Sequence, residues 1–239
     1  MKRRKFLVPS FMAGVVLSAC GGGGGGYGGG GGGGSMNLSS APGESALVAF
    51  LGSSHQYTLT ATNAGNTFTA KLSNAPNAGT TTFNGSAPAY STVQTVTLDA
   101  NGALVANSIT TVYYLLNPYM DLGSVSNTGS PYAIVTTFSP LPATVTVGGS
   151  GGFETVTYYH DSTKTVLDAD ETITYTVSAN DSTTLFVCLD STISNVTAQG
   201  MADHMANGTE SDCYTVDAAG TAALDSITLM VNGTTLTFM

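Results

Sequence analysis

Residues 172–179 read Thr-Ile-Thr-Tyr-Thr-Val-Ser-Ala and alternate between hydroxyl-bearing and apolar side chains. Successive side chains of a β-strand point to opposite faces, so a period of two gives one apolar face and one polar face. Residues 57–63 repeat the pattern, because Tyr57, Leu59 and Ala61 alternate with threonines. Strands of this kind favour an antiparallel sheet with one buried face.

The same period of two continues along most of the chain. Turn residues separate the apolar stretches, and Asn232-Gly233 is the pair typical of a two-residue hairpin. Residues 195–206 are the one segment expected to be helical, and Gly200 keeps that helix short. The expected fold class is therefore all-β, built from antiparallel, sandwich-like meanders. Further strands are predicted at residues 67–72, 93–98, 108–116, 132–138, 143–147, 154–159, 183–189, 212–216, 226–231 and 234–238.

Two blocks of sequence recur at one offset of 118 residues. Residues 57–63 reappear as residues 175–181, and residues 94–110 share 7 identities in 17 positions with residues 212–228. A gapless recurrence in two places indicates an internal duplication.

The duplication predicts the domain organisation. We expect two related β modules at residues 36–125 and 153–239, joined by a connecting hairpin or linker at residues 126–152. Each module has enough residues for a small β domain.

The chain begins with the parts of an export signal. Lys2, Arg3, Arg4 and Lys5 give a positive start, and residues 6–19 are mostly apolar. Fourteen residues are too few to cross a hydrocarbon core of ~30 Å as a helix. The segment therefore predicts targeting and not a membrane span.

Residues 17–20, Leu-Ser-Ala-Cys, resemble the lipobox of bacterial lipoproteins. The resemblance implies that residues 1–19 are a signal peptide cut after Ala19, and that Cys20 carries the lipid that attaches the chain to a membrane. Gly21 stands where the inner-membrane retention signal of that family usually has Asp, which favours the outer membrane in a Gram-negative source. An ordinary secretory signal that leaves Cys20 free is the alternative.

Residues 21–35 contain 13 glycines, with Tyr27 and Ser35 as the other two residues. A glycine chain of this length packs no core and behaves as a flexible coil. Together with the lipidated Cys20, residues 20–35 are expected to be a tether.

The part of the chain beyond the signal is strongly acidic. Lys71 and Lys164 are its only basic residues against 15 acidic ones, a formal charge of −13. Such a charge repels nucleic acid and anionic headgroups, so we expect neither as a partner. The membrane is contacted through the lipid alone, and no cofactor is implied.

Cys188 and Cys213 are the two cysteines of the folded part and are predicted to form a disulfide. No Cys-x-x-Cys spacing points to redox chemistry. The offset of 118 places Cys188 on Ala70 and Cys213 on Thr95, so a shared fold would make Ala70 and Thr95 neighbours.

No motif predicts catalysis. The chain has no Gly-x-Ser-x-Gly elbow, and His160-Asp161 has no second histidine or nucleophile at a matching spacing. We therefore interpret His160-Asp161 as a surface turn, expect no catalytic residue, and expect that the protein is not an enzyme.

Two groups of potential metal ligands stand out, and neither has the spacing of a known site. Asp168, Asp170 and Glu171 lack the loop of a calcium site, so we interpret them as part of a hairpin turn. The segment between the cysteines has the densest set of ligands, and its metal candidates are Asp203, His204 and Asp212, with Glu210 beside them. We interpret this segment as a stapled surface loop and predict no metal.

These observations favour a lipid-anchored cell-envelope protein with a non-enzymatic binding or structural role. Residues 141–148 and 158–164 are similar to segments of envelope lipoproteins of Gram-negative bacteria, a similarity that implies no activity. The protein, glycan or apolar ligand that it would bind is not indicated.

Two alternative functions stay open. One is a periplasmic carrier in which both repeats form a half-barrel or barrel around an apolar ligand, with Tyr57, Phe68, Tyr175 and Phe186 lining the cavity. The other is an envelope hydrolase.

Overall fold

Twelve strands form one continuous antiparallel sheet, and almost every strand pairs with its neighbour in the chain. The computed structural model describes residues 37–86 and 88–239. The all-β prediction is confirmed, and so is the meander. In spatial order the strands are β2 (His55–Asn63), β3 (Asn66–Pro76), β4 (Tyr90–Ala100), β5 (Ala103–Leu116), β6 (Tyr119–Ser126), β7 (Tyr132–Phe138), β9 (Ser150–Tyr159), β10 (Leu167–Ala179), β11 (Thr184–Ser194), β12 (Gly208–Asp217), β13 (Ala222–Val231) and β14 (Thr234–Phe238).

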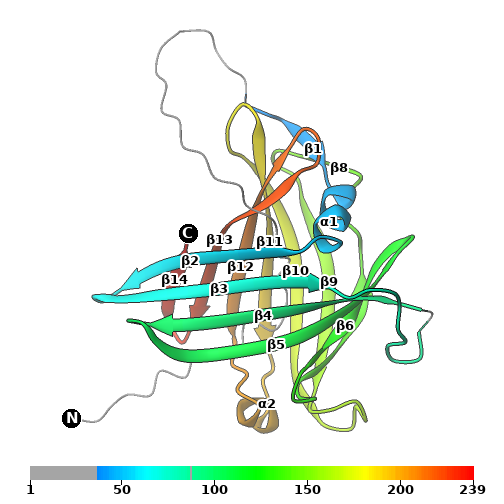
Figure 1. Cartoon of the computed structure of the whole chain (residues 1–239), viewed down its shortest axis with the longest axis vertical. Coiled ribbons are helices and arrows are strands. Elements are labelled where there is room, and N and C mark those ends of the chain that lie inside the picture. Colours follow the sequence, from blue (N-terminus) through cyan, green and yellow to red (C-terminus); the bar gives the residue numbers. More distant parts are fainter. Residues whose placement is uncertain (1–36, 87) are drawn as a thin grey trace.

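The first and last strands of this sheet meet, so the sheet is nearly closed and barrel-like. The backbone N–H of Thr60 in β2 donates to the carbonyl of Met239 at 2.9 Å, and the N–H of Met239 donates back to Thr60 at 3.1 Å. In Figure 1, β2 to β6 run across the direction of β9 to β14, which gives two crossing layers. Near-perpendicular layers are one of the two ways in which sheets pack face to face.

The core lies between these layers and follows the predicted alternation. On β10, Ile173, Tyr175 and Val177 are buried, whereas the threonines between them are exposed. The hydroxyl-bearing face therefore meets the solvent, as the period of two requires. The two-residue hairpin at Asn232-Gly233 also forms, with both residues at positive φ.

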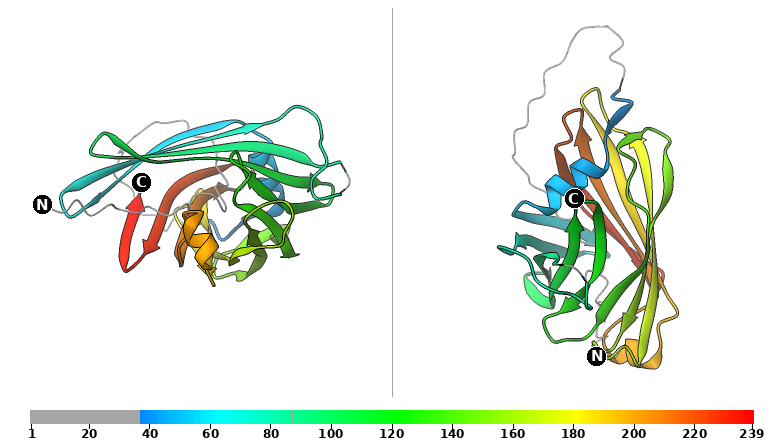
Figure 2. Two further views of the ribbon diagram at one scale, coloured as in Figure 1. Left: turned by 90° about the horizontal axis from the view of Figure 1, so that it is seen from below. Right: turned by 90° about the vertical axis from the view of Figure 1, so that its right-hand side faces the viewer.

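One end of the barrel-like sheet is covered by α1 (Glu44–Leu51) and by a small sheet of β1 (Ser40–Pro42) and β8 (Thr144–Thr146). Figure 2 shows α1 between the two layers. Phe50 packs edge-on against Tyr214 of β12, and the carbonyl of Leu51 accepts from Tyr114 Oη of β5 at 3.4 Å. The helix thus joins both layers.

The sequence pattern missed α1 and β6. The helix has eight residues and no side-chain cap, so its stability comes from buried contacts and not from local signals. The predicted helix at residues 195–206 exists as the short α2 (Ala198–Ala202), at the lower end of Figure 1. Among the described residues, no helix is both long and apolar enough to span a bilayer.

The predicted repeat agrees with the strand boundaries in part. The offset of 118 carries the bounds of β3 onto those of β11, but Ala70 faces the core and Cys188 faces outward. β3 pairs with β2, and β11 pairs with β10, but the registers of these two hairpins differ by one residue. The shift makes the residues of β11 that correspond to inward residues of β3 point outward. Ala70 pairs with Leu98 and not with Thr95, although Thr95 lies on the same neighbouring strand.

Both halves of the chain contribute to one sheet. The predicted connecting segment, residues 126–152, holds β7 and the start of β9, and β7 pairs with β9 along Tyr132–Phe138. Independent folding of residues 36–125 and 153–239 stays a prediction.

Replacing Phe238 with Ala should weaken the closure between β14 and β2. Phe238 is fully buried in the last strand, so its truncation is expected to cost about 3–5 kcal/mol. That cost corresponds to a fall in melting temperature of about 2–4 °C per kcal/mol for a domain of this size. Thermal unfolding followed by circular dichroism measures it, with the exposed Thr237→Ala as control. Equal, small effects of both substitutions would show that β14 contributes little to the core.

Candidate functional site

The Cys188–Cys213 disulfide is present and joins two residues that lie directly opposite each other on β11 and β12. Both cysteines point to the outer face, away from the core. The bond therefore staples a strand pair on the outer face of the sheet. The predicted lipid-attachment residue, Cys20, lies outside the described residues.

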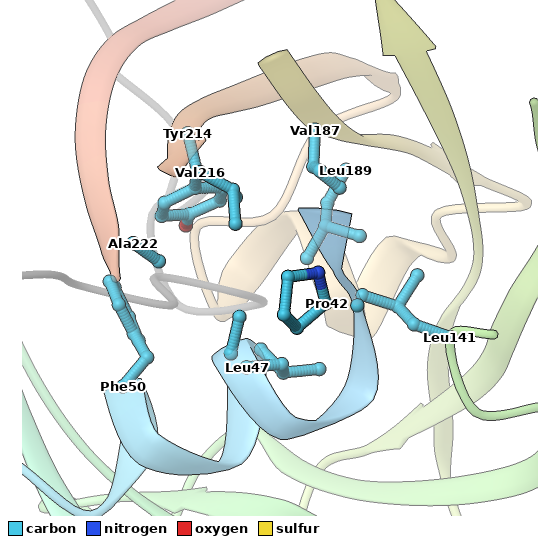
Figure 3. A pocket seen from close by; sticks show the side chains of 11 residues that line it. Pro42, Leu47, Phe50, Leu141, Val187, Leu189, Tyr214, Val216 and Ala222 are labelled. Atoms are coloured by element: carbon cyan, nitrogen blue, oxygen red, sulfur yellow. The ribbon is translucent and has the colours of Figure 1, made fainter. Parts of the chain in front are cut away.

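A small apolar cavity separates α1 from β11, β12 and β13. In Figure 3, Pro42, Leu47 and Phe50 face the side chains that the strands present from the other side. The cavity volume is about 30 Å³, close to the share of one water molecule. Its walls are apolar, so it is a gap in the packing of α1 and is too small for a ligand.

A larger hollow opens where β6 and β7 separate. These strands pair only at three positions, Gly123 with Ile134, Ser124 with Ala133 and Val125 with Tyr132. Beyond Ile134 the strands diverge, and a hollow of about 310 Å³ lies between them. Apolar and hydroxyl side chains line it together with one amide and one carboxyl: Phe83, Asn84, Ser86, Met120, Asp121, Leu122, Ile134, Val135, Thr136, Thr137 and Phe138.

Asp121 is the one ionisable side chain among the described residues of this lining. Its Oδ1 accepts from the backbone N–H of Gly123 at 3.2 Å. Burial raises the pKa of Asp121 to about 7, although hydrogen bonds from the Gly123 and Leu122 backbone act in the opposite direction. The Asp121 carboxyl therefore ionises less readily than an exposed aspartate.

Gly123 fixes the separation of the two strands. It has φ of 133°, and a Cβ at this position would lie 2.1 Å from the carbonyl oxygen of Ala133. Only glycine permits so close an approach with this backbone conformation. Gly123 thus lets the backbones of β6 and β7 meet at the paired end, next to the hollow.

The cavity lining expected from the sequence is not the lining observed. Phe68 and Tyr175 are buried in the core and Tyr57 packs against it. Phe186 lies on the outer face of β11, because Leu185 and Val187 occupy the inward positions. None of the four side chains lines the β6–β7 hollow.

Four carboxyl side chains, Glu154, Glu171, Glu210 and Asp212, point into the interior and are each 5 % exposed or less. We call them the interior carboxyls. They lie within the neighbouring strands β9 to β12. Glu154 pairs with Ile173 across β9 and β10, Ile173 pairs with Ser191 of β11, and Ser191 pairs with Glu210 of β12. The predictions of a turn at Glu171 and of a surface loop that holds Glu210 and Asp212 were both wrong, because these residues occupy inward positions of strands.

Within the described part of the chain, these four side chains face no basic partner. Burial raises the pKa of Glu154, Glu171, Glu210 and Asp212, with the nearby carboxyls adding to the effect at Glu154 and Glu210. The two lysines are engaged elsewhere, Lys71 with Asp99 and Lys164 with Asn84.

Hydrogen bonds satisfy these carboxyls only in part, and one oxygen each of Glu154, Glu210 and Asp212 has no partner among the described residues. Tyr158 Oη donates to Glu171 Oε2 at 2.6 Å, and Glu210 shares a hydrogen bond with Asp212. A buried carboxyl without a basic partner resists ionisation, because an unpaired buried charge is costly.

A third feature lies at the rim near α2, where His160, Asp168 and Asp203 converge. One ligand atom from each lies within 4.8 Å of the others, and we call the three residues the rim cluster. His160 Nδ1 is 2.7 Å from Asp203 Oδ2, and Gln199 Nε2 donates to the same oxygen at 3.1 Å.

Within the rim cluster, the pKa is raised for two residues and lowered for the third. The hydrogen bond that His160 donates to Asp203 raises the pKa of His160. Burial, followed by the Asp203 charge, raises the pKa of Asp168 to about 6. Burial acts to raise the pKa of Asp203 as well, but hydrogen bonds from Gln199, His160 and Ser130 outweigh it and lower that pKa.

The metal candidates taken from the sequence do not come together. Asp203 belongs to the rim cluster, whereas His204 is exposed and outside it, and Asp212 is in the interior. The cluster instead combines His160 from the predicted surface turn, Asp168 from the predicted hairpin turn and Asp203 from the segment between the cysteines. The pairing of β9 with β10 and the docking of α2 create this combination, and no local spacing signals it.

No protein-family model, curated protein sequence or solved structure matches this chain. The hollow, the interior carboxyls and the rim cluster are therefore the features from which a function can be inferred.

The interior carboxyls should make the protein less stable as the pH rises. Their pKa values are higher in the folded chain than in the unfolded chain, so their contribution to stability is present below pH about 4 and declines as the pH rises toward the folded values. Glu210→Gln keeps a hydrogen-bond donor toward Asp212 and has no proton to lose. Its melting temperature relative to wild type should therefore increase between pH 5 and pH 8.

The control is Asp225→Asn, which removes one charge at an exposed position of β13. It shows how much the removal of one negative charge alone changes the melting temperature of this acidic chain. A pH profile for Glu210→Gln that parallels the Asp225→Asn profile would contradict the assignment of a raised pKa to Glu210. Melting temperatures at pH 5, 6.5 and 8 decide between the two results.

Proposed function

We propose that this chain is a lipid-anchored envelope protein that binds and carries a small, largely apolar ligand in the β6–β7 hollow. The observation that carries the proposal is the hollow of about 310 Å³ between the diverging halves of β6 and β7. Small-molecule sites are concave, mostly apolar and supplied with a few polar groups, and their volumes begin near 300 Å³.

The lining indicates the chemistry of the ligand. Leu122, Ile134 and Phe138 offer apolar contact, while Asp121 offers one hydrogen-bonding group. The acidic chain and the Asp121 carboxyl both disfavour an anion. A compact apolar molecule with a neutral or cationic polar end fits these walls best.

One side of the hollow is held in place by stacked aromatic rings. Phe83 stacks on Tyr113 at a centroid distance of 4.4 Å and on Tyr132 at 5.3 Å. These contacts fix the segment between β3 and β4 against β5 and β7. A largely preformed wall lowers the ordering cost of binding.

A binding role accounts for the lining better than catalysis does. General acid–base and nucleophilic mechanisms need positioned pairs of reactive groups, and the described lining contains Asp121 as its one ionisable residue. We therefore propose a non-enzymatic carrier and not a hydrolase.

The cell-envelope location rests on the amino terminus and is supported by the disulfide. The segment Leu-Ser-Ala-Cys at residues 17–20 resembles a lipobox, and residues 21–35 would give the anchored chain a flexible tether. A Cys188–Cys213 bond suits an oxidising compartment outside the cytoplasm. We place the protein at the envelope face of a membrane, the outer membrane in a Gram-negative cell.

Mass spectrometry of the mature amino terminus tests the anchor. The chain is expected to begin at Cys20 and to carry the added mass of its acyl chains, and Cys20→Ser should abolish both the modification and the membrane fractionation. Lipid attachment of this kind holds because each buried CH₂ contributes about 0.8 kcal/mol. An unmodified Cys20, or a mature chain that begins elsewhere, would refute the lipid-anchor proposal.

Binding of the neutral fluorescent probe N-phenyl-1-naphthylamine tests the hollow. Met120→Trp is expected to weaken probe binding at least tenfold, since Met120 is partly exposed and lines the hollow, where indole would occupy the space. Met230→Trp is the matched control, because Met230 is similarly exposed on β13. A fluorescence titration measures both.

The anionic probe 1-anilinonaphthalene-8-sulfonate should bind more weakly than the neutral probe. Equal loss of binding in both tryptophan variants, or no probe binding by the wild type, would contradict the carrier proposal.

A further inference from the structure

We propose that the rim cluster, His160, Asp168 and Asp203, binds one divalent transition-metal ion of the Zn²⁺ class. This site is separate from the β6–β7 hollow, and the proposal does not depend on ligand carriage. It rests on how the fold builds the cluster and on one buried side chain that the protein alone leaves unsatisfied.

A β-bulge in β10 directs Asp168 into the cluster. The register between β10 and β9 shifts between Leu167 and Ala169, so Asp168 has no partner across the ladder. Asp168 and Ala169 are both fully buried, although they are consecutive in the strand. A bulge of this kind re-aims a side chain that regular alternation would direct to the other face.

The helix α2 is fastened to the same bulge. The backbone N–H of Thr197 donates to the carbonyl of Asp168 at 2.8 Å, and Thr197 Oγ1 donates to the carbonyl of Leu167 at 2.8 Å. A Cβ on Gly200 would lie 2.4 Å from the Asp168 carbonyl oxygen, so the helix and strand backbones are in direct contact there. This contact holds Asp203, at the end of α2, next to Asp168.

Asp168 is the observation that points to a ligand. Its side chain is fully buried, and neither of its carboxylate oxygens receives a hydrogen bond from a donor within the described part of the chain. It faces the carboxylate of Asp203. Two facing carboxylates repel unless a proton or a cation lies between them, and unpaired buried carboxylates are rare in proteins.

The donor set fits a transition metal better than calcium. One imidazole nitrogen and two carboxylate oxygens are ligands that Zn²⁺ accepts, whereas Ca²⁺ takes six to eight oxygens. The mutual distances of up to 4.8 Å must shorten by about 1 Å for Zn²⁺, whose bonds are about 2.0–2.2 Å. His160 has the freedom to move, because 42 % of its side chain is exposed, and the same exposure admits the ion from solvent.

Hydrogen bonds already orient the ligands. Gln199 donates to Asp203, and Thr197 bonds α2 to the strand segment that carries Asp168. Partners of this kind hold ligating side chains in place around a metal. The arrangement is therefore a supported cluster and not a chance meeting of exposed acidic residues.

Isothermal titration of the full chain with Zn²⁺ tests the proposal. All proteins carry Cys20→Ser, so that no free thiol competes, and are treated with a chelator before titration. We expect one ion per chain at micromolar affinity or tighter. Asp168→Asn and His160→Gln should each weaken binding at least tenfold, and His204→Gln should leave it unchanged.

The controls separate metal binding at the cluster from non-specific histidine binding and from loss of the fold. His204→Gln removes an exposed imidazole next to Asp203 and outside the cluster. Asp168→Asn is isosteric and removes a buried carboxyl, so its fold is expected to be retained. In a parallel thermal-shift experiment, Zn²⁺ should raise the melting temperature of the wild type and not that of Asp168→Asn.

Three results would overturn the proposal. The first is an absence of Zn²⁺ binding by the wild type at 100 µM ion. The second is an equal loss of affinity in His204→Gln, which would indicate non-specific histidine binding. The third is wild-type affinity in Asp168→Asn, which would mean that Asp168 and Asp203 share a proton instead of an ion.

Discussion

Closure of the sheet by backbone hydrogen bonds between β2 and β14 is the constraint on which the rest of the structure depends. An open sheet of twelve twisted strands would leave two hydrogen-bonding edges and an uncovered apolar face. With Thr60 and Met239 bonded to each other, the inward faces of all the strands share one interior. Every second residue of each strand must then fit that common space, while hydroxyl side chains occupy the outer face.

The shared interior is divided between an apolar part and an acidic part. Phe50 of α1 and Val187 and Leu189 of β11 meet around the gap beneath the helix, and burial of each contributes about 1.5–3 kcal/mol. Toward α2, Glu171 and Glu210 occupy the same inward positions and lower the gain from closure. Their protons and hydrogen bonds make burial tolerable, because a neutral carboxyl is far less costly to bury than a charged one. The acidic part of the interior therefore gains less from burial than the apolar part does.

The sequence predicted the strands better than it predicted the sites. The ranges 132–138 and 234–238 match β7 and β14, because alternation is local information. Helix α1 escaped prediction since its eight residues depend on contacts with both layers. The disulfide was predicted from the two cysteines that follow the predicted export signal, but the rim cluster did not follow from spacing. Asp168 reaches His160 and Asp203 only because a bulge reverses its direction and α2 docks on that bulge, and both events depend on long-range pairing.

The rim cluster and the β6–β7 hollow are physically connected through the loop that joins β6 to β7. Ser130 in that loop lies 3.4 Å from His160 Nδ1, and Tyr132 at the start of β7 pairs with Tyr159, the residue before His160. A metal ion on His160 Nδ1 would displace the hydrogen bond to Asp203 and the contacts with Gln199 and Ser130. A ligand in the hollow would contact the strands that leave this loop. Any coupling between the two sites must be reciprocal, since linkage requires each occupant to change the affinity of the other by the same factor. The position of Ser130 therefore makes the β6–β7 loop the element through which the two proposed sites would influence each other.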